Sequence, residues 1–501
     1  MQLFILIFSL SLVIFNLTLP IMAGIYIVSD LGGSTFLASY GVSFFCLGNA
    51  LSTPFGKPFI IRLSPVKLFL VCLLLMIVFS WQCATATSYF DFVLYRFLEG
   101  LASGPLYVLI SVYFIPTVFT PEKQAKLLPY LFICFTFTPV LGASWGGWVA
   151  YTHHWRFLFF TNIPICLFLI ILVSHYFREL DQPFHKSYLD KLGLFFYSIS
   201  IIFIGSALIV GQQLDWFRSH LINMLLIVGG VSTVLFVIRS LNTTHPLIDL
   251  RLFKTFYFTF AIVNMGLLFA MYYGMVILLG LWLKLYVNYT FNWIALIIVT
   301  MAFGAWIPIF LDYQRLDPRL PLAVALIFLA ASCFYTTTFS VDTNFTRIAF
   351  SRVLAGIGLA FFLPPIFRLS IQIFTKEEAA ESVNCFHVIR LICSGLGAAL
   401  FVTLWHHRQV FYYERLGGNL TSFSHATSMF FKKAAQFNLH GNKALAQLSH
   451  AVTRQATALA LDDCFYLMAW IMVGLLFFLL LTFYPLKIRP HLNPQKAVKT
   501  V

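Results

Sequence analysis

The sequence predicts an all-α integral membrane protein with fourteen transmembrane helices. Its mean hydropathy is +0.88, and only 10% of its 501 residues are charged, whereas a soluble domain carries about a quarter. Apolar runs recur along the chain and, with their uncharged flanks, reach the roughly 20 residues that a helix needs to cross about 30 Å of hydrocarbon. The runs are continuous, not alternating, which favours helices over the strands of a barrel.

Short polar connections separate the expected spans, whose boundaries are approximate. The spans cover residues 3–27, 34–55, 67–87, 90–115, 127–151, 157–177, 190–211, 220–239, 257–283, 290–311, 320–339, 346–373, 383–405 and 463–485. The first span starts almost at Met1, but it lacks the basic stretch and the cleavage site of a signal peptide. We therefore expect it to be a membrane helix.

Two short patterns occur twice along the chain, which indicates a duplicated bundle. "RFLEGLASGPL" at 96–106 returns as "RVLAGIGLAFFLPP" at 352–365, and "YTHHWRF" at 151–157 has a fainter echo in "TLWHHRQ" at 403–409. Internal repeats around a mid-membrane site are typical of secondary transporters. We therefore divide the chain into a six-helix bundle at 1–180, two inserted helices with linkers at 181–255, and a second six-helix bundle at 256–501.

The distribution of Lys and Arg predicts that both termini are cytoplasmic. With the N-terminus inside, the short outer connections hold only Arg156, Arg218, Lys284 and Arg347, and most of the remaining basic residues fall in the inner connections and the C-terminal tail. The formal charge of +14 is therefore spread beside anionic lipid and does not indicate nucleic-acid binding. One outer connection, 406–462, is long, and we expect an amphipathic helix near 443–460.

Arg96 and Glu99 are the first candidates for chemistry, because they lie one helical turn apart inside an apolar span. Residues at i and i+3 can pair, and a charge at the bilayer centre costs at least about 2.5 kcal/mol. One interpretation is a structural ion pair near the end of the helix. The other, which we favour, is a charge-compensated site whose proton occupancy or substrate contact changes as the cavity switches sides.

Further polar side chains lie at depth in the second half of the chain. Arg352 is the repeat counterpart of Arg96, and His387 and Arg390 share one helix face. His387 is either a hydrogen-bonded structural residue or a proton carrier, because imidazole titrates near neutral pH. If these arginines and Arg368 line the cavity, neutral or weakly acidic amphipathic substrates would be favoured over lipophilic cations.

Three stretches carry the motifs of a known family. They are "FNLTLPIMAGIY" with Asn16, "YRFLEGLASGPL" with Arg96 and Gly100, and "GASWGGWVAYTHHWRFLFFTNIP" with Gly142, Gly146 and Gly147. The chain resembles the fourteen-helix drug:proton antiporters of the major facilitator superfamily, the EmrB/QacA type, along nearly its whole length. The resemblance implies the major facilitator fold, with two six-helix bundles and two inserted helices, and transport by alternating access.

The glycines of this motif also have a physical interpretation of their own. Gly142 and Gly146 are four residues apart, so they clear one face of their helix and allow a neighbouring backbone to approach closely. The cleared face is either a simple packing surface or an interface that rocks during transport.

The chain departs from the family at several positions that matter for coupling. Glu99 replaces the amide of the fourth-helix motif, and Ser11 stands where the family often carries an acid in the first helix. The loop "KPFIIRLS" between the second and third spans retains only Arg62 of the usual gating motif. Whether proton coupling is retained is therefore open.

We expect a proton-driven exporter of hydrophobic or amphipathic small molecules in the bacterial inner membrane. The alternatives are a dedicated exporter of an endogenous metabolite such as a siderophore, and a solute symporter. The long outer connection could contact a periplasmic adaptor, as in relatives that work in tripartite pumps. Substrate identity, proton stoichiometry and oligomeric state are not determined by the sequence.

Other classes of protein are disfavoured by the motifs that are missing. There is no Gly-rich phosphate loop, HExxH or Gly-x-Ser-x-Gly, so we expect no enzyme activity and no cofactor. The nine cysteines are isolated in apolar surroundings and do not form a metal or disulfide framework. The pairs His153-His154 and His406-His407 lack a carboxylate, and adjacent histidines on a helix point in different directions, so we expect no metal site.

Overall fold

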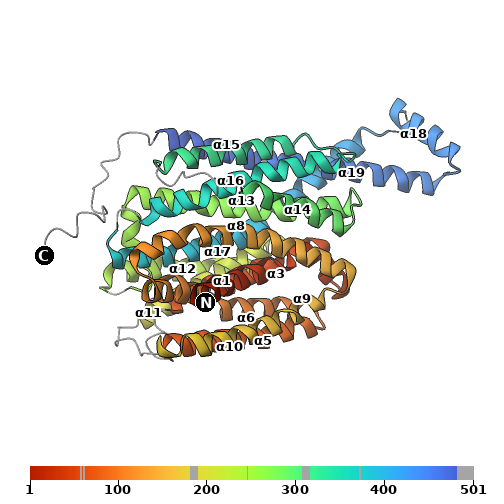
Figure 1. Cartoon of the computed structure of the whole chain (residues 1–501). Coiled ribbons are helices and arrows are strands. Elements are labelled where there is room, and N and C mark those ends of the chain that lie inside the picture. Colours follow the sequence, from red (N-terminus) through yellow and green to blue (C-terminus); the bar gives the residue numbers. More distant parts are fainter. Residues whose placement is uncertain are drawn as a thin grey trace.

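The computed structural model describes residues 1–56, 59, 63–180, 190–244, 246–306, 316–371, 374–421 and 423–481. Every regular element in these ranges is a helix, which confirms the all-α prediction. In Figure 1, α13 to α16 and α19 lie at the top of the bundle, α5, α6 and α10 at the bottom, and α8 and α17 between them.

The first half of the chain begins with a broken helix. α1 (Gln2–Thr18) and α2 (Pro20–Asp30) are bent by 43°. The bend coincides with Pro20, which cannot donate a backbone hydrogen bond to the preceding turn. The following elements are η1 (Thr35–Ser39), α3 (Tyr40–Ser52), η2 (Thr53–Phe55), α5 (Pro65–Thr85), α6 (Tyr89–Val108), the π-helical η3 (Leu109–Phe114), α7 (Ile115–Val118), α8 (Pro121–Thr152), α9 (Arg156–Phe160), α10 (Asn162–Tyr176) and η4 (Arg178–Leu180).

The remaining elements form the inserted pair and the second half. The pair consists of α11 (Lys191–Val210) and α12 (His220–Asn242), with η5 (Trp216–Arg218) between them and η6 (Leu250–Lys254) after them. The second half contains α13 (Phe256–Leu285), α14 (Phe291–Trp306), α15 (Arg319–Thr336), α16 (Phe345–Ile371), α17 (Lys376–Gly418), α18 (His425–Gln436) and α19 (Asn442–Leu481).

A helix occupies each of the expected spans, but fewer helices qualify as spans by length and hydropathy alone. Among the described residues, ten helices are long and apolar enough to cross a membrane, or eleven if the bent pair α1 and α2 forms one span. α3, α8 and α14 occupy the remaining expected spans. The count of fourteen transmembrane helices therefore stays a prediction.

The packing of the two halves follows the internal repeat. α6 packs between α3 and α5, and α16 packs in the same way between α14 and α15; likewise α1 packs on α8, and α13 on α17. The halves meet along two seams, α3 against α17 and α8 against α14. The domain boundaries at 1–180, 181–255 and 256–501 remain a prediction.

The repeated Arg-x-Leu-x-Gly motif has the same packing role in both halves. A Cβ atom on Gly100 of α6 would collide with the backbone carbonyl of Phe45 on α3. A Cβ atom on Gly356 of α16 would collide with the carbonyl of Met301 on α14. In each half, the glycine therefore lets two helix backbones come into direct contact.

The inserted helices pack on each other, and α11 also packs on α3 and α17. The Tyr197 hydroxyl of α11 donates a hydrogen bond to the carbonyl of Ala50 on α3 at 2.7 Å, and Gly205 of α11 makes room for Leu47. Through α11, the inserted pair thus packs against one boundary between the halves.

Three connections that the sequence places on the outer side lie together in the structure. The Arg156 guanidinium donates to the carbonyls of Ala84 and Ala86, both at 2.9 Å, and forms an ion pair with Asp30 at 3.3 Å. The indole of Trp155 also donates to Asp30, at 3.0 Å. This cluster agrees with the expected alternation of the first six helices across the bilayer.

The long outer segment is a helical projection and not an extended loop. α17 continues beyond its expected span to Gly418, α18 follows, and α19 starts at Asn442, so the expected helix at 443–460 is the first part of α19. Figure 1 shows α18 beyond one end of the bundle. Arg408 of α17 and Asp463 of α19 form an ion pair at 2.5 Å at the base of this projection.

Candidate functional site

Arg96 and Glu99 form the predicted ion pair on α6, with Nη1 and Oε2 2.6 Å apart and both side chains fully buried. The other carboxylate oxygen, Oε1, accepts hydrogen bonds from Asn16 Nδ2 on α1 at 2.6 Å and from Ser80 Oγ on α5 at 2.5 Å. Asn162 of α10 donates to Ser80 Oγ at 3.1 Å and to Oε1 at 3.5 Å. Four helices therefore hold one carboxylate in a closed polar network.

Each nitrogen of the Arg96 guanidinium has a partner in the same half of the molecule. Its Nε donates to the carbonyl of Gly41 at 3.2 Å, and its Nη2 donates to the carbonyl of Asn16 at 3.0 Å. Nη1 also donates to the side-chain oxygen of Asn16 at 3.1 Å, and the Phe45 ring lies 4.3 Å from Cζ. This charge is matched by a counter-charge, by hydrogen bonds and by an aromatic face, as a buried ion requires.

The Arg96–Glu99 network lies inside the first half and not between the halves. Its partners are on α1, α3, α5 and α10, which all belong to residues 1–180. Of these helices, α3 also packs on α17 at the boundary between the halves.

Arg352, the repeat counterpart of Arg96, is held by hydroxyl groups. Its Nη2 donates to Thr336 and Ser351, both at 2.8 Å, and to Ser332 at 3.5 Å. Within the described part of the chain, Nε and Nη1 have no hydrogen-bond partner. The position that corresponds to Glu99 is Ala355, so the second half repeats the arginine but not its counter-charge.

His387 and Arg390 of α17 line a cavity between the two halves, as their shared helix face predicts. The cavity is small, with a volume of about 40 Å³, which is well below the roughly 300–1,000 Å³ of typical small-molecule sites. Its other walls come from both halves and are mostly apolar. They include Leu10, Ile115, Leu131 and Phe135 from one half and Leu363, Phe367 and Phe386 from the other.

The side chains of Arg390 and His387 have few hydrogen-bond partners among the described residues. Arg390 is 1% exposed, and among the described residues its Nε and Nη2 have no hydrogen-bond partner. The ring of His387 stacks on Tyr107, with centroids 5.1 Å apart, and its Nε2 lies 3.5 Å from Ser111 Oγ in the π-helical η3. Nδ1 of His387 has no partner in the described ranges either.

Aromatic rings surround the Arg390 charge. The Cζ atom lies 5.0 Å from the ring centres of Tyr107 and Phe135 and 5.4 Å from that of Phe269. A desolvated cation–π contact is worth about 2 kcal/mol, whereas moving an ion out of water costs several kcal/mol. These contacts offset only part of the cost of burying the cation.

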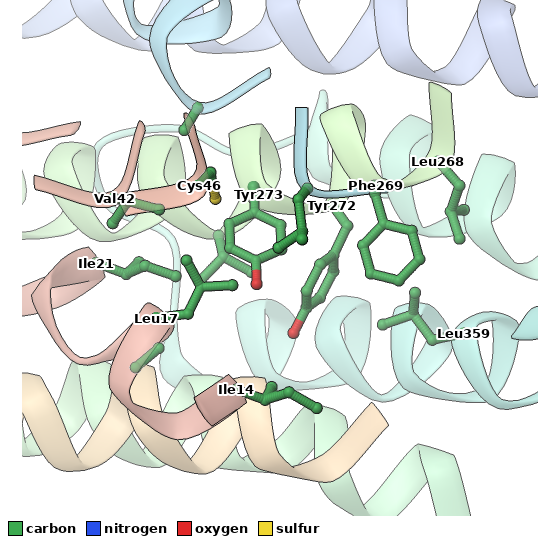
Figure 2. Close-up of a cluster of buried hydrophobic side chains, with 14 of the residues drawn as sticks. Ile14, Leu17, Ile21, Val42, Cys46, Leu268, Phe269, Tyr272, Tyr273 and Leu359 are labelled. Atoms are coloured by element: carbon green, nitrogen blue, oxygen red, sulfur yellow. The ribbon is translucent and has the colours of Figure 1, made fainter. Parts of the chain in front are cut away.

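Apolar contacts fill the space between the halves next to the cavity. Figure 2 shows Tyr273 of α13 near Leu17 of α1 and Cys46 of α3, with Tyr272 next to it and Phe269 nearer Leu359 of α16. Further along, Tyr26 of α2 packs on Phe291 of α14 with ring centres 4.9 Å apart. By the expected orientation, these contacts lie toward the outer side, and the cavity lies toward the inner side.

The glycines of the fifth expected span allow the close approach that their spacing suggests. A Cβ atom on Gly146 of α8 would collide with the carbonyl of Leu19 at the bend between α1 and α2, and one on Gly142 with Thr18. A Cβ atom on Gly147 would lie 3.0 Å from Met22 Cβ and 3.1 Å from the ring of Phe291 on α14. Gly147 is therefore at a contact between the halves. Arg62, the candidate gating residue, lies outside the described residues.

Some residues of the first-half network were not singled out for chemistry from the sequence. Asn16 was expected to be part of a packing motif, whereas it binds both members of the ion pair. Ser80 and Gly41 carry no signal of their own in the sequence, because the helices that place them beside Glu99 and Arg96 are far away along the chain. Their role follows only from how the helices assemble.

Comparison with known proteins defines the class of this protein. Residues 3–314 match the family described as Major Facilitator Superfamily, and the chain belongs to this family of membrane transporters.

The fold agrees with solved structures of such transporters. The crystal structure of the POT family transporter PepTSo covers 96% of this chain and 98% of its own, with a TM-score of 0.59 at 13% identity. A bacterial homolog of the human lysosomal transporter Spinster, in an inward-facing and unoccupied conformation, covers 95% of this chain and 96% of its own, with a TM-score of 0.54 at 15% identity.

The relatives narrow the class to one branch of the superfamily. The chain is 25% identical to the multidrug export protein EmrB of Haemophilus influenzae, over 92% of this chain and 90% of that protein. It is also 25% identical to the fatty acid resistance protein FarB of Neisseria gonorrhoeae, over 91% of this chain and 89% of that protein. EmrB of Escherichia coli K12 is also 25% identical, over 92% of this chain and 90% of that protein. This is the EmrB/QacA-type branch that the motifs resemble, so the chain is a multi-pass transporter and not an enzyme.

Proposed function

We propose that this protein exports hydrophobic or amphipathic small molecules across a bacterial inner membrane by proton antiport and alternating access. In this proposal, both termini are cytoplasmic and the helical projection of residues 406–462 faces the periplasm. The observation that supports it most directly is the cavity between the halves. It is small and apolar in this structure, its walls come from both halves, and Arg390 and His387 are among the residues that line it.

The names of the relatives support efflux over other kinds of transport. Two of the three describe export of multiple drugs and one describes resistance to fatty acids. Both descriptions are compatible with molecules of extensive apolar surface, and the cavity between the halves is walled by Leu, Ile and Phe side chains.

Glu99 is the proposed proton site. Protonation would remove the counter-charge of Arg96, whose remaining bonds go to Asn16 on α1 and to the backbone of Gly41 on α3. α3 packs along the seam with α17, the helix that carries Arg390. A change at Glu99 thus has a contiguous physical route to the cavity, through helices that form the boundary between the halves.

Proteoliposomes with an imposed pH gradient test this proposal. We expect gradient-driven flux of dodecanoate, an acidic amphiphile, or of ethidium, a lipophilic cation, through the wild-type protein. Glu99→Gln keeps the size of the side chain and one acceptor oxygen but cannot titrate, so it should abolish gradient dependence while exchange without a gradient persists. Arg96→Ala should impair both processes. Flux that is indifferent to the gradient in the wild-type protein would refute antiport, and unchanged coupling in Glu99→Gln would remove Glu99 from the mechanism.

Two alternatives make different predictions in the same assay. A dedicated exporter of an endogenous metabolite, such as a siderophore, would move neither probe but would move that metabolite. A symporter would accumulate solute in the direction of the proton gradient, whereas an antiporter moves it in the opposite direction.

The projection is the proposed contact for a periplasmic adaptor protein. It carries exposed apolar side chains at Phe423, Phe437 and Leu445, which are 96%, 76% and 57% exposed. Exposed apolar surface on a protruding segment is typical of an interaction site. Deletion of α18 should abolish co-purification of an adaptor with the transporter while substrate binding to the transporter persists.

A further inference from the structure

We propose that a groove on the lipid-facing side of the α8–α14 seam holds an acyl chain of a membrane phospholipid, and that the bound chain stabilises the arrangement of the two halves in this structure. The groove shares no lining residue with the cavity beside Arg390. The inference concerns the bilayer and not the substrate, so it goes beyond the proposed function and does not depend on proton coupling.

The groove has walls from both halves of the molecule. Its volume is about 780 Å³, within the roughly 300–1,000 Å³ of typical small-molecule sites. The first half supplies Phe15 of α1, Ile165 of α10 and residues of α8 between Leu141 and Trp148. The second half supplies residues 292–299 of α14. A molecule in the groove therefore touches helices on both sides of the seam.

The groove extends from one end of the bundle to about the middle of the membrane. α8 ends at Thr152, and Leu141 lies eleven residues before it, which is roughly 16 Å along the helix. This length is about half of the roughly 30 Å of hydrocarbon. α14 begins at Phe291, which lies beside Gly147 of α8, so its lining residues are at the same end. The groove thus covers the depth that the acyl chains of one leaflet occupy.

The lining is mostly apolar, and several of its side chains are open to the surface. Leu141, Trp145 and Leu296 are 46%, 43% and 51% exposed, and none of the described residues that line the groove is charged. Burial of an acyl chain against this surface is favourable, whereas a charged head group would meet no counter-charge there. Trp148 and Asn292, near the membrane surface, carry N–H donors that suit the ester carbonyls of a phospholipid.

Phospholipid is the expected occupant because this face of the protein borders the bilayer. Leu141 and Leu296 are exposed on helices that occupy expected spans, so the groove is continuous with the surface that lipid covers. Phospholipid is also the most abundant molecule at this depth, and mass action therefore favours it over a transported solute.

The position of the groove couples its occupancy to the arrangement of the halves. Tyr26 of α2 contacts Phe291 of α14 at the same end of the seam. When the halves separate there, α14 moves away from α8, and a chain in the groove loses its contacts with one of them. A ligand that binds one arrangement more tightly shifts the population toward it. The bound chain should therefore favour the present arrangement.

Retention of lipid by the purified full-length protein tests the site. Native mass spectrometry in a mild detergent, after addition of dioleoyl phosphatidylcholine, should show a protein population with phospholipid bound. Ala295→Phe fills the groove and Trp145→Ala removes part of its wall, so each should lower the bound fraction at least about threefold. Gly230→Phe on α12 and Trp470→Ala on α19 are the matched changes away from the groove, and they should leave it unchanged.

A cysteine pair reports the arrangement of the halves. In the variant with Tyr26→Cys and Phe291→Cys, addition of phospholipid to the delipidated protein should raise the fraction that a short thiol reagent bridges in a fixed time. With Ala295→Phe in the same background, the fraction should no longer respond to phospholipid. Thermal unfolding of every variant checks that it is folded.

Equal retention by the wild type and both groove variants, or no retention by the wild type, would overturn the site. Bridging that does not respond to phospholipid would overturn its stabilising role. Phosphatidylglycerol should be retained like phosphatidylcholine, since a strong preference would mean that a head group and not a chain is recognised. Release of the phospholipid by ethidium would assign the groove to a transported molecule instead. These measurements use no pH gradient, so failure of proton antiport would leave them unaffected.

Discussion

The charged residues at depth are distinguished by what surrounds each of them. Glu99 accepts hydrogen bonds from three neighbouring helices and forms an ion pair with Arg96, so its charge is more fully balanced than those of Arg352 and Arg390. Arg352 has hydroxyl partners only, and Arg390 has aromatic faces. Three buried arginines of one chain thus differ in how completely the protein balances their charge.

The Arg96–Glu99 pair should show the energetics of a buried ion pair. Glu99→Ala leaves the Arg96 cation buried without its partner, and such a change costs about 3–5 kcal/mol, whereas replacing both partners by apolar residues is often nearly neutral. We therefore expect Glu99→Ala to lower the melting temperature in detergent more than the double change Arg96→Met with Glu99→Leu. Equal losses in the single and the double variant would mean that the two charges do not stabilise each other.

At the scale of the elements, close contact between helices depends on glycines, which have no side chain. The bend of α1 and α2 brings the carbonyl of Leu19 against Gly146 of α8, and the repeated glycines Gly100 and Gly356 do the same for α6 and α16. The glycines therefore fix the distance between helices in both halves.

Two glycine substitutions on helices should have opposite effects. Gly146→Ala places a methyl group on the Leu19 carbonyl, so α8 must move away from α1 and α2, and we expect a lower melting temperature. Gly230→Ala on α12 is the matched control, because no heavy atom lies within 4 Å of the added Cβ. There the higher helix propensity of alanine should keep or raise the melting temperature. A Gly146→Ala protein as stable as the wild type would show that the α8 contact is not tight.

At the scale of the whole molecule, the two halves meet along two symmetric seams, with the cavity on one side of an apolar closure (Figure 2). The proposed alternating access would use this arrangement, with the halves rocking about the seams while each half keeps its own core.

A crosslink between the halves at their apolar contact should trap the protein in one conformation. Tyr26 of α2 and Phe291 of α14 are in contact across the halves, so the pair Tyr26→Cys and Phe291→Cys should be bridged by an oxidant or a short bifunctional thiol reagent. We expect the bridged protein to lose transport and to keep substrate binding, since the cavity lies below the bridge. Each single cysteine variant is the control. Full transport by the bridged protein would exclude opening at this point.

The orientation in the membrane can be tested with single cysteines at exposed sites. Phe423→Cys lies in the projection, and Arg251→Cys lies in the connection between the inserted pair and α13. In right-side-out membrane vesicles, a membrane-impermeant maleimide should label the first and label the second only after permeabilisation. The reverse pattern would invert the proposed topology. The native cysteines are a weak background, because eight of the nine are buried and Cys393 is only partly exposed.

Much of the fold could be predicted from the sequence, because the bilayer leaves few choices. Apolar runs long enough to cross hydrocarbon must be helices, and the expected spans coincide with helices throughout the described chain. The pairing of Arg96 with Glu99 and the shared wall of His387 and Arg390 were also predictable, since helical spacing alone places i and i+3 on one face.

The sequence by itself determined the class of the molecule, its helices, and which residues are ionic at depth, because these depend on local hydropathy and on spacing along a single helix. Only the tertiary structure decided which ionic residues face each other and which face a cavity. Arg96, Arg352 and Arg390 look alike in the sequence, yet one is paired inside the first half, one is held by hydroxyl groups, and one borders the space between the halves. The physical reason is that the balance of a buried charge depends on groups that distant helices supply.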